Sequence, residues 1–224
     1  MSFAAILFDC DGVLVDSEPI RLEILRKMLA DLGWQLSPSE CKRFFLGKSS
    51  KEEVQLIENH LNIKLDHEWH QAFTLRRNQA LRQHVIATPG IYECLKALRK
   101  SWPLHIACVS AAEKSKMTLQ LDKLGLTDFF DGYIFSGTQV LRNKPYPDVY
   151  LAAAQALGVD PTQCAVIEDS ITGITAGASS GATVFAYCPD DEDPAPLLEA
   201  GAQYFFRDMR LLPDILQRNT SSNA

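Results

Sequence analysis

The sequence has no long apolar segment and no excess of basic residues. No stretch approaches the roughly 18 apolar residues that a membrane-spanning helix needs, so we expect no membrane partner. The N-terminus lacks a basic segment followed by an apolar one, and we therefore expect no signal peptide. Acidic residues outnumber basic ones by 28 to 22, and the net charge is −6. Because nucleic acids bind basic surfaces, we expect no nucleic-acid partner.

Cysteine is not scarce, but no pair of cysteines is spaced as C-x-x-C. The spacing gives no support for a zinc site. Most of the cysteines lie in apolar segments, which is typical of buried, reduced thiols in a cytoplasmic protein. The six cysteines are Cys10, Cys41, Cys94, Cys108, Cys164 and Cys188.

What the sequence does have is enough apolar content, 46% of 224 residues, for one large domain or for one domain with an insertion. Short apolar runs alternate with helical patterns after residue 85. The runs that predict strands are residues 4–8, 104–109, 133–135, 164–167, 183–187 and 204–206. The stretches that predict helices are 89–99, 114–124, 147–157 and 168–179. This alternation predicts an α/β fold with a Rossmann-like, doubly wound parallel sheet.

Residues 16–84 differ from the rest, because they carry helical periodicity and almost no strand signal. An all-helical block between the first strand and the next strand–helix unit indicates an inserted domain. We therefore predict a catalytic core of residues 1–15 and 85–224, and a helical cap of residues 16–84. The polar C-terminal residues 219–224 are expected to fray. No sustained apolar surface pattern is present, and we expect a monomer.

Two aspartates stand at the end of the first apolar run. Asp9 and Asp11 follow residues 4–8 directly, at the strand end where open α/β sheets bind ligands. Two carboxylates this close repel each other, and a divalent cation would offset that repulsion. The alternative is that both residues only start a turn before Gly12, since Asp and Gly are common turn residues.

Further polar residues follow later strands. Ser110 comes after residues 104–109, and Glu168 and Asp169 come after residues 164–167. Parallel strands end on the same edge, so we expect these side chains to lie near Asp9, with Lys144 approaching from a loop. Taken singly, Ser110 also fits a helix cap, Lys144 a solvated loop, and the two acids a helix first turn.

Taken together, these motifs resemble the haloacid dehalogenase-like hydrolases, in the branch of helical-cap phosphatases and β-phosphoglucomutase-like proteins. The resemblance covers essentially the whole chain. The four segments that carry it are DCDGVLVDS at residues 9–17, Val109-Ser110, Lys144-Pro145 and Glu168-Asp169-Ser170.

The resemblance implies a Mg²⁺-dependent phosphatase acting on a small phosphorylated metabolite, a sugar phosphate or sugar-acid phosphate. It implies that Asp9 is the nucleophile that forms an aspartyl-phosphate, and that Asp11 is the general acid and base. Mg²⁺ would be held by Asp9, by the main-chain carbonyl of Asp11, and by Asp169, with Glu168 as a direct or water-mediated ligand.

The remaining implied contacts are to the substrate. Ser110 and Lys144 would bind the phosphoryl group, and main-chain N–H groups of Asp11, Gly12 and Ala111 would complete its cradle. Side chains of the cap would determine which substrate binds. The candidates are Glu18, Arg21, Gly47, Lys48, Ser49, Arg76 and Arg77. Several cap cations suit a phosphorylated sugar acid.

Two positions depart from the mutase pattern. Arg21 stands where the mutases carry a cap-hinge histidine, and Ala111 stands where many relatives carry Asn. A phosphomutase therefore remains the alternative to a phosphatase. A receiver-type switch would lack the helical insertion and would be near ~120 residues. A non-catalytic scaffold is a further alternative, although every implied catalytic position is filled.

Overall fold

A computed structural model describes residues 3–48, 50–101, 105–189 and 193–221 of the chain. The chain folds into two compact units. The first unit is Met1–Asp16 with Ala87–Ala224, and the second is Ser17–Ile86. The predicted cap, residues 16–84, falls within the second unit except for Asp16.

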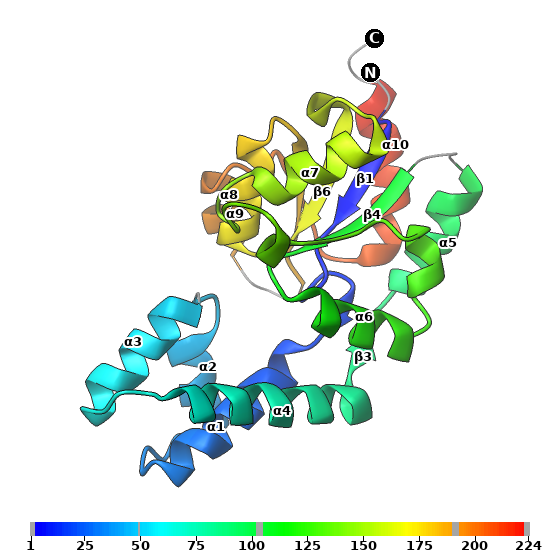
Figure 1. The fold of residues 1–224 in the computed structure, drawn as a ribbon. Helices are drawn as coiled ribbons and strands as arrows, with labels where there is room; N and C mark the ends of the chain where they lie inside the picture. Colours follow the sequence, from blue (N-terminus) through cyan, green and yellow to red (C-terminus); the bar gives the residue numbers. More distant parts are fainter. Residues whose placement is uncertain (1–2, 49, 102–104, 190–192, 222–224) are drawn as a thin grey trace. The chain divides into compact units, whose positions relative to one another are not determined.

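The first unit contains a six-stranded sheet in the order β5-β4-β1-β6-β7-β8, in which every neighbouring pair is parallel (Figure 1). In this order the strands are Ile134–Ser136, His105–Ser110, Ala5–Phe8, Cys164–Glu168, Thr183–Tyr187 and Tyr204–Phe206. The predicted Rossmann-like α/β fold is confirmed. Leu104, the predicted start of one strand, lies outside the described residues, as do residues 222–224 of the tail.

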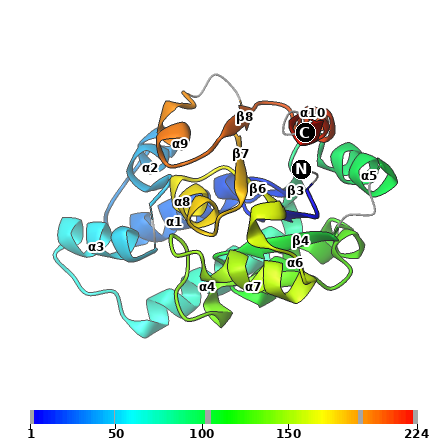
Figure 2. The same cartoon turned by 90° about the horizontal axis from the view of Figure 1, so that it is seen from above.

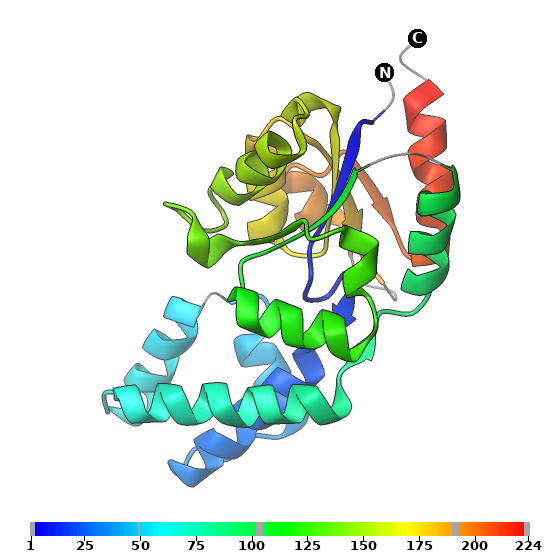
Figure 3. The ribbon, with the colours of Figure 1, turned by 45° about the vertical axis from the view of Figure 1, so that its right-hand side comes forward.

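Helices cover both faces of this sheet. Figures 1 and 3 show α7 and α8 on one face and α5 and α10 on the other, and Figure 2 shows the strands between these layers. The α-helices of this unit are α5 Ile91–Ser101, α6 Lys114–Lys123, α7 Asp148–Leu157, α8 Ile171–Ser179, α9 Ala195–Glu199 and α10 Leu212–Ser221. The short 3₁₀ turns are Thr127–Phe130, Gly137–Gln139, Pro161–Gln163 and Met209–Leu211.

The central strand β1 is buried along its whole length because both of its faces are covered. Its side chains Ala5 and Leu7 pack in one apolar cluster with Val149 of α7 and Ile174 of α8. Gly177 brings α8 close to the sheet, since a Cβ at that position would lie 2.9 Å from Val166. The sheet is therefore a rigid base for the residues at its strand ends.

One predicted helix boundary is wrong. Residues 168–179 were expected to be helical, but Glu168 is the last residue of β6 and α8 begins at Ile171. The loop between β6 and α8 ends at Ser170, the N-cap of α8, whose side chain accepts a hydrogen bond from the N–H of Gly173. Glu168 is consequently a strand-end residue and not a first-turn helix acid.

The second unit is helical, with α1 Glu18–Asp31, α2 Pro38–Phe45, α3 Ser50–Leu61 and α4 His67–His84. Its own apolar core includes Leu25, Leu29, Phe45 and Ile57. The short helix α2 was not predicted, although Ser37 and Glu40 form a capping box at its start. Where the chain passes between the units, β2 Val15–Asp16 pairs with β3 Ile86–Ala87.

The cysteines and the helix lengths can also be compared with the sequence analysis. All six cysteines are free and buried, as the sequence predicted. Among the described residues, none of the helices combines the length and the apolar character of a membrane span.

Candidate active site

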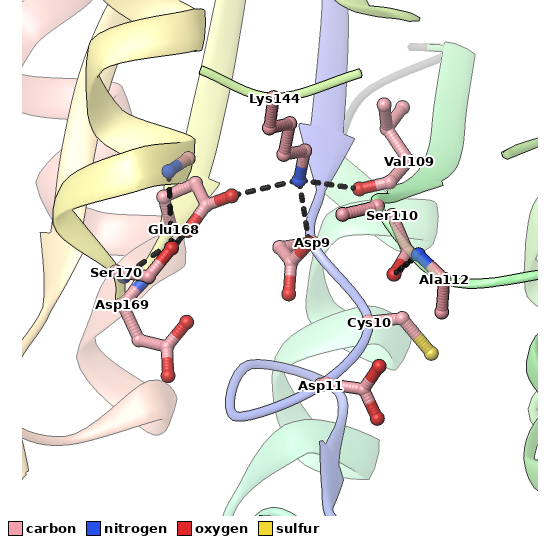
Figure 4. Close-up of polar contacts among 12 residues, drawn as sticks. Asp9, Cys10, Asp11, Val109, Ser110, Ala112, Lys144, Glu168, Asp169 and Ser170 are labelled. Atoms are coloured by element: carbon pink, nitrogen blue, oxygen red, sulfur yellow. Dashed lines mark hydrogen bonds and ion pairs between the residues drawn. The ribbon is translucent and has the colours of Figure 1, made fainter. Parts of the chain in front are cut away.

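The polar residues predicted to converge come from three adjacent strands. Asp9 follows β1, which pairs in parallel with β4 on one side and with β6 on the other. Ser110 ends β4 and Glu168 ends β6, so both lie beside Asp9 (Figure 4). The N–H of Asp9 donates to the carbonyl of Ile167 at 2.9 Å, which extends the sheet pairing to the aspartate itself. The sheet register therefore fixes the backbone of Asp9.

Lys144 joins these strand ends from the loop before α7. Its Nζ donates to Asp9 Oδ1 at 2.6 Å, to Glu168 Oε1 at 2.8 Å and to the carbonyl of Val109 at 3.1 Å (Figure 4). The side chain is only 3% exposed. Burial alone would lower the pKa of Lys144, but Asp9 and Glu168 together raise that pKa well above its ordinary value. Lys144 is thus a fixed cation, and the reading of it as a solvated loop residue is wrong.

Glu168 is bound by donors on both carboxylate oxygens. Oε1 accepts from Lys144 and from the hydroxyl of Tyr150, and Oε2 accepts from the N–H groups of Asp169 and Ser170. The carboxylate also packs against Gly173, where a Cβ would lie 1.7 Å from Oε1. Glu168 therefore ties Lys144 to the start of α8.

Three carboxylates are close enough to share one cation. Asp9, Glu168 and Asp169 each offer an oxygen, and these oxygens lie within 4.8 Å of one another. Burial raises the pKa of Asp169 well above its ordinary value, and the neighbouring carboxylates of Glu168 and Asp9 add to this rise. Burial likewise raises the pKa of Asp9 to about 7, although Lys144 opposes the shift.

The donor set fits Mg²⁺. Its atoms are carboxylate oxygens, the ligands that this ion prefers. Three carboxylates face one ammonium group, that of Lys144, so the ionised cluster keeps two uncompensated negative charges, which one divalent cation would balance. Gly12 leaves room for the Asp169 carboxylate: it has φ +91°, and a Cβ there would lie 1.9 Å from Oδ2.

Asp11 is held elsewhere. Both oxygens of its carboxylate accept from Lys116 Nζ at 2.8 Å, and Oδ1 also accepts from Gln120 Nε2 at 3.0 Å. Figure 4 shows the Asp11 side chain turned away from Asp169. Its carboxylate is not part of the acidic group described above.

The loop after β4 is held by side chains from the end of β5 and from the loop before α7. Ser110 is 2% exposed, and its Oγ accepts from the N–H of Ala112 at 3.1 Å. A hydroxyl that accepts one bond can still donate its hydrogen to a phosphate oxygen. The carbonyl of Ala111 accepts from Asn143 Nδ2 at 2.9 Å, and the carbonyl of Ala112 accepts from Ser136 Oγ at 2.6 Å.

One predicted member of the phosphate cradle has a partner within its own turn. The N–H of Gly12 donates to the carbonyl of Val15 at 2.8 Å, because residues 10–15 form a tight turn. A contact between this N–H and a phosphate group stays a prediction. The contribution of Gly12 is the space that it leaves for Asp169.

The predicted cap residues lie in the second unit. Arg21 pairs with Glu18 at 3.0 Å and with Glu53 at 2.6 Å, and Arg76 pairs with Asp31 at 3.2 Å. Arg77 donates to the side chain of Asn78. Gly47 has φ +76° and Lys48 follows it, whereas Ser49 lies outside the described residues. Substrate contacts by these residues stay predictions.

Sequence reasoning missed several residues that contact the predicted site residues, among them Tyr150 and Gly173 at Glu168, and Lys116 and Gln120 at Asp11. One signal was available for the last two. They lie four residues apart on the helix that follows Ser110, and residues at that spacing share a helix face. Nothing in the sequence showed that this face meets Asp11.

The comparisons with known proteins agree with one another. Residues 6–187 match a family model described as haloacid dehalogenase-like hydrolase. The chain is 30% identical over 200 residues to a phosphorylated carbohydrates phosphatase of Thermotoga maritima, covering 88% of this chain and 91% of that protein. It is 30% identical over 193 residues to the 6-phosphogluconate phosphatase of Escherichia coli, covering 83% of each.

A solved structure is similar over nearly the full length. It is a haloacid dehalogenase family hydrolase from Deinococcus radiodurans, crystallised with bound phosphate and sodium. The TM-score is 0.81 and the sequence identity is 32%, over 99% of each chain.

Proposed function

Since this chain belongs to the haloacid dehalogenase-like hydrolase family and is a phosphatase, we propose that it is a Mg²⁺-dependent enzyme that uses Asp9 as its nucleophile. Its substrate is a small phosphorylated metabolite, a sugar phosphate or a sugar-acid phosphate. The reaction passes through an aspartyl-phosphate intermediate.

The observation that carries this proposal is the position of Asp9. Its carboxylate stands at the end of the central strand, 2.6 Å from the buried ammonium group of Lys144 and within the acidic group that includes Asp169. A carboxylate fixed between a cation and a metal-binding group is restrained to one orientation. Such restraint favours attack on a phosphorus atom, because phosphoryl transfer depends mainly on positioning and charge neutralisation.

The residues that would hold Mg²⁺ are Asp9, Asp169 and the main-chain carbonyl of Asp11. Glu168 would act beside them, directly or through water. When bound, the ion would neutralise charge on the phosphoryl oxygens and on the nucleophile. Both oxygens of Glu168 already accept hydrogen bonds from protein donors, which supports Asp9 and Asp169 as the principal side-chain ligands.

In the first step, a carboxylate oxygen of Asp9 forms a bond to phosphorus and the bond from phosphorus to the ester oxygen breaks. Asp11 gives its proton to that departing oxygen. In the second step, Asp11 takes a proton from water, the water oxygen bonds to phosphorus, and the bond to Asp9 breaks. Lys144 offsets negative charge on Asp9 and the phosphoryl group, and Ser110 donates to a phosphoryl oxygen.

The substrate class is proposed from the relatives, whose names specify phosphorylated carbohydrates and 6-phosphogluconate. The predicted preference for an acidic sugar rested on cap cations. Within the cap, however, Arg21 is paired with two carboxylates and Arg76 with one. We therefore propose neutral sugar phosphates and sugar-acid phosphates equally as substrates. The predicted monomeric state and cytoplasmic location stay predictions.

A screen of purified protein tests this function. With Mg²⁺ present, we expect free phosphate from at least one phosphorylated sugar or sugar acid, at a kcat/KM at least about tenfold above that for nucleotides. Phosphate release and isomerised sugar are both measured. An isomerised product would establish the phosphomutase alternative, and a best substrate among the nucleotides would contradict the sugar class.

Metal removal should abolish this activity. In excess EDTA we expect phosphate release to fall by at least about 100-fold, since a bound cation contributes several kcal/mol of transition-state stabilisation. Excess Mg²⁺ should restore the rate, while NaCl at the same ionic strength should not. Full activity in EDTA would exclude the metal part of the proposal.

A further inference from the structure

Helix α6 presents two buried side chains to Asp11. Lys116 is 7% exposed and Gln120 is fully buried. They are four residues apart, so they lie on one face of the helix. Their three hydrogen bonds, two from Lys116 Nζ and one from Gln120 Nε2, engage both carboxylate oxygens of Asp11. We call Lys116 and Gln120 the α6 clamp.

Both members of the clamp have a reason to bind Asp11. A buried lysine is costly without an anionic partner, and the Asp11 carboxylate provides one at 2.8 Å. The other end of the Gln120 amide faces Cys10, whose Sγ lies 4.0 Å from Oε1. With Oε1 facing the thiol, Nε2 is directed toward Asp11.

In the clamp both carboxylate oxygens of Asp11 accept hydrogen bonds, whereas a proton donor must carry its proton on one of them. A general acid must come within about 3 Å of the oxygen that receives its proton. In the proposed reaction this oxygen is bonded to the phosphorus that Asp9 attacks. In this structure the Asp11 carboxylate turns away from Asp169 and is bound by helix α6 (Figure 4).

We propose that Lys116 and Gln120 are positioning residues that hold the acid/base Asp11 withdrawn from the phosphoryl site until substrate competes for it. This inference rests on the proposed function, because it needs Asp11 to be the proton donor. A group that is competent only part of the time lowers the observed rate by its competent fraction. Weakening the clamp should raise that fraction.

The test compares two esters that differ in their need for an acid. The p-nitrophenolate group leaves without a proton, whereas the alkoxide of glucose 6-phosphate must be protonated. The measured quantity is kcat/KM for glucose 6-phosphate divided by kcat/KM for p-nitrophenyl phosphate. We expect Lys116→Met to raise this ratio about threefold to tenfold, and Gln120→Leu to raise it less. A purely structural loss would lower both constants together and leave the ratio unchanged.

Two control variants bracket the result. Lys116→Arg keeps the positive charge and can donate to both carboxylate oxygens, so it should return the ratio to within about twofold of the wild-type value. Lys123→Met removes an exposed lysine from the end of the same helix and should leave the ratio unchanged. An unchanged ratio in both Lys116→Met and Gln120→Leu would overturn the clamp. A lower ratio would also overturn it, because Lys116 would then assist Asp11 at the phosphoryl site.

A crystal structure separates this inference from the proposed function. In crystals of Lys116→Met without substrate, the Asp11 carboxylate should turn toward Asp9. If the screen finds no phosphorylated sugar or sugar acid that the wild-type protein hydrolyses, the proposed function fails and the crystal structure alone decides the clamp. An Asp11 side chain that keeps its wild-type position in that variant would then overturn it; should the variant not fold, the same measurement is made on Gln120→Leu.

Discussion

Replacing Asp9 with asparagine is expected to lower phosphatase turnover by at least about 10⁴-fold while leaving the fold intact. The amide cannot form the acyl phosphate, so the loss should appear in kcat. The substitution should not unfold the protein, because burial already raises the pKa of Asp9 to about 7 and disfavours its ionised form. Lys144 would keep its ion pair with Glu168. Phosphate release and thermal unfolding are the two measurements.

A matched control variant and acid trapping of the aspartyl-phosphate test this prediction further. Asp128→Asn makes the same chemical change at an exposed position of the same unit and should have wild-type activity. In wild-type protein quenched with acid during turnover, labelled phosphate should be recovered on the peptide that contains Asp9. Turnover by Asp9→Asn at the wild-type rate, or label on a different peptide, would refute the nucleophile assignment.

Replacing Lys144 with methionine should damage both activity and stability. The side chain is 3% exposed and it is the ion-pair partner of both Asp9 and Glu168. Removal of one partner from a buried ion pair costs about 3–5 kcal/mol of unfolding free energy. With the phosphoryl charge also unopposed, we expect kcat/KM to fall at least about 10³-fold. Lys96→Met, at an exposed position of α5, is the control and should alter neither quantity.

The stability loss in Lys144→Met should depend on pH in a defined direction. The pKa of Asp9 is about 7 in the folded protein and its ordinary value is 3.8, so the folded state binds more protons between these values. Stability of the metal-free protein therefore falls as pH rises through this window. Without Lys144 the folded pKa of Asp9 rises further, because Lys144 opposes the shift.

Measurements in EDTA test this sign. The difference in unfolding free energy between wild-type protein and Lys144→Met should be smaller at pH 5, where Asp9 is protonated in both proteins, than at pH 8. A deficit that shrinks as pH rises would show that Lys144 does not act through the carboxylates around it.

Much of the site was predictable because it depends on short-range pattern. Asp9 directly follows the buried strand β1, and β6 ends at Glu168, so a parallel sheet places both residues at one edge. Lys144 could not be placed in the same way, because it belongs to a loop and not to a strand. The sequence placed it in a loop before a helix, close to the strand ends, and the structure adds that it contacts Asp9 and Glu168 directly.

Other features could not be predicted, because they are contacts between residues that are far apart in the sequence and share no motif. Tyr150 contacts Glu168 across the packing of α7 against the sheet, and its helix pattern alone marks it as a core residue. The packing of Asp169 against Gly12 could not be predicted for a similar reason. The sequence shows that Gly12 follows Asp11, but only the fold shows that Asp169 from a later loop lies against it.

The sequence by itself determined the parallel sheet, the edge at which its polar residues meet, and the identity of Asp9 as the central carboxylate. These features follow from the apolar runs that form the strands and from their alternation with helices, and both can be read from residues that are close in the sequence. Only the tertiary structure decided where the Asp11 side chain lies. Its partner Lys116 is 105 positions away in the sequence, and the two meet because α6 packs beside the turn after β1 with one of its faces toward that turn.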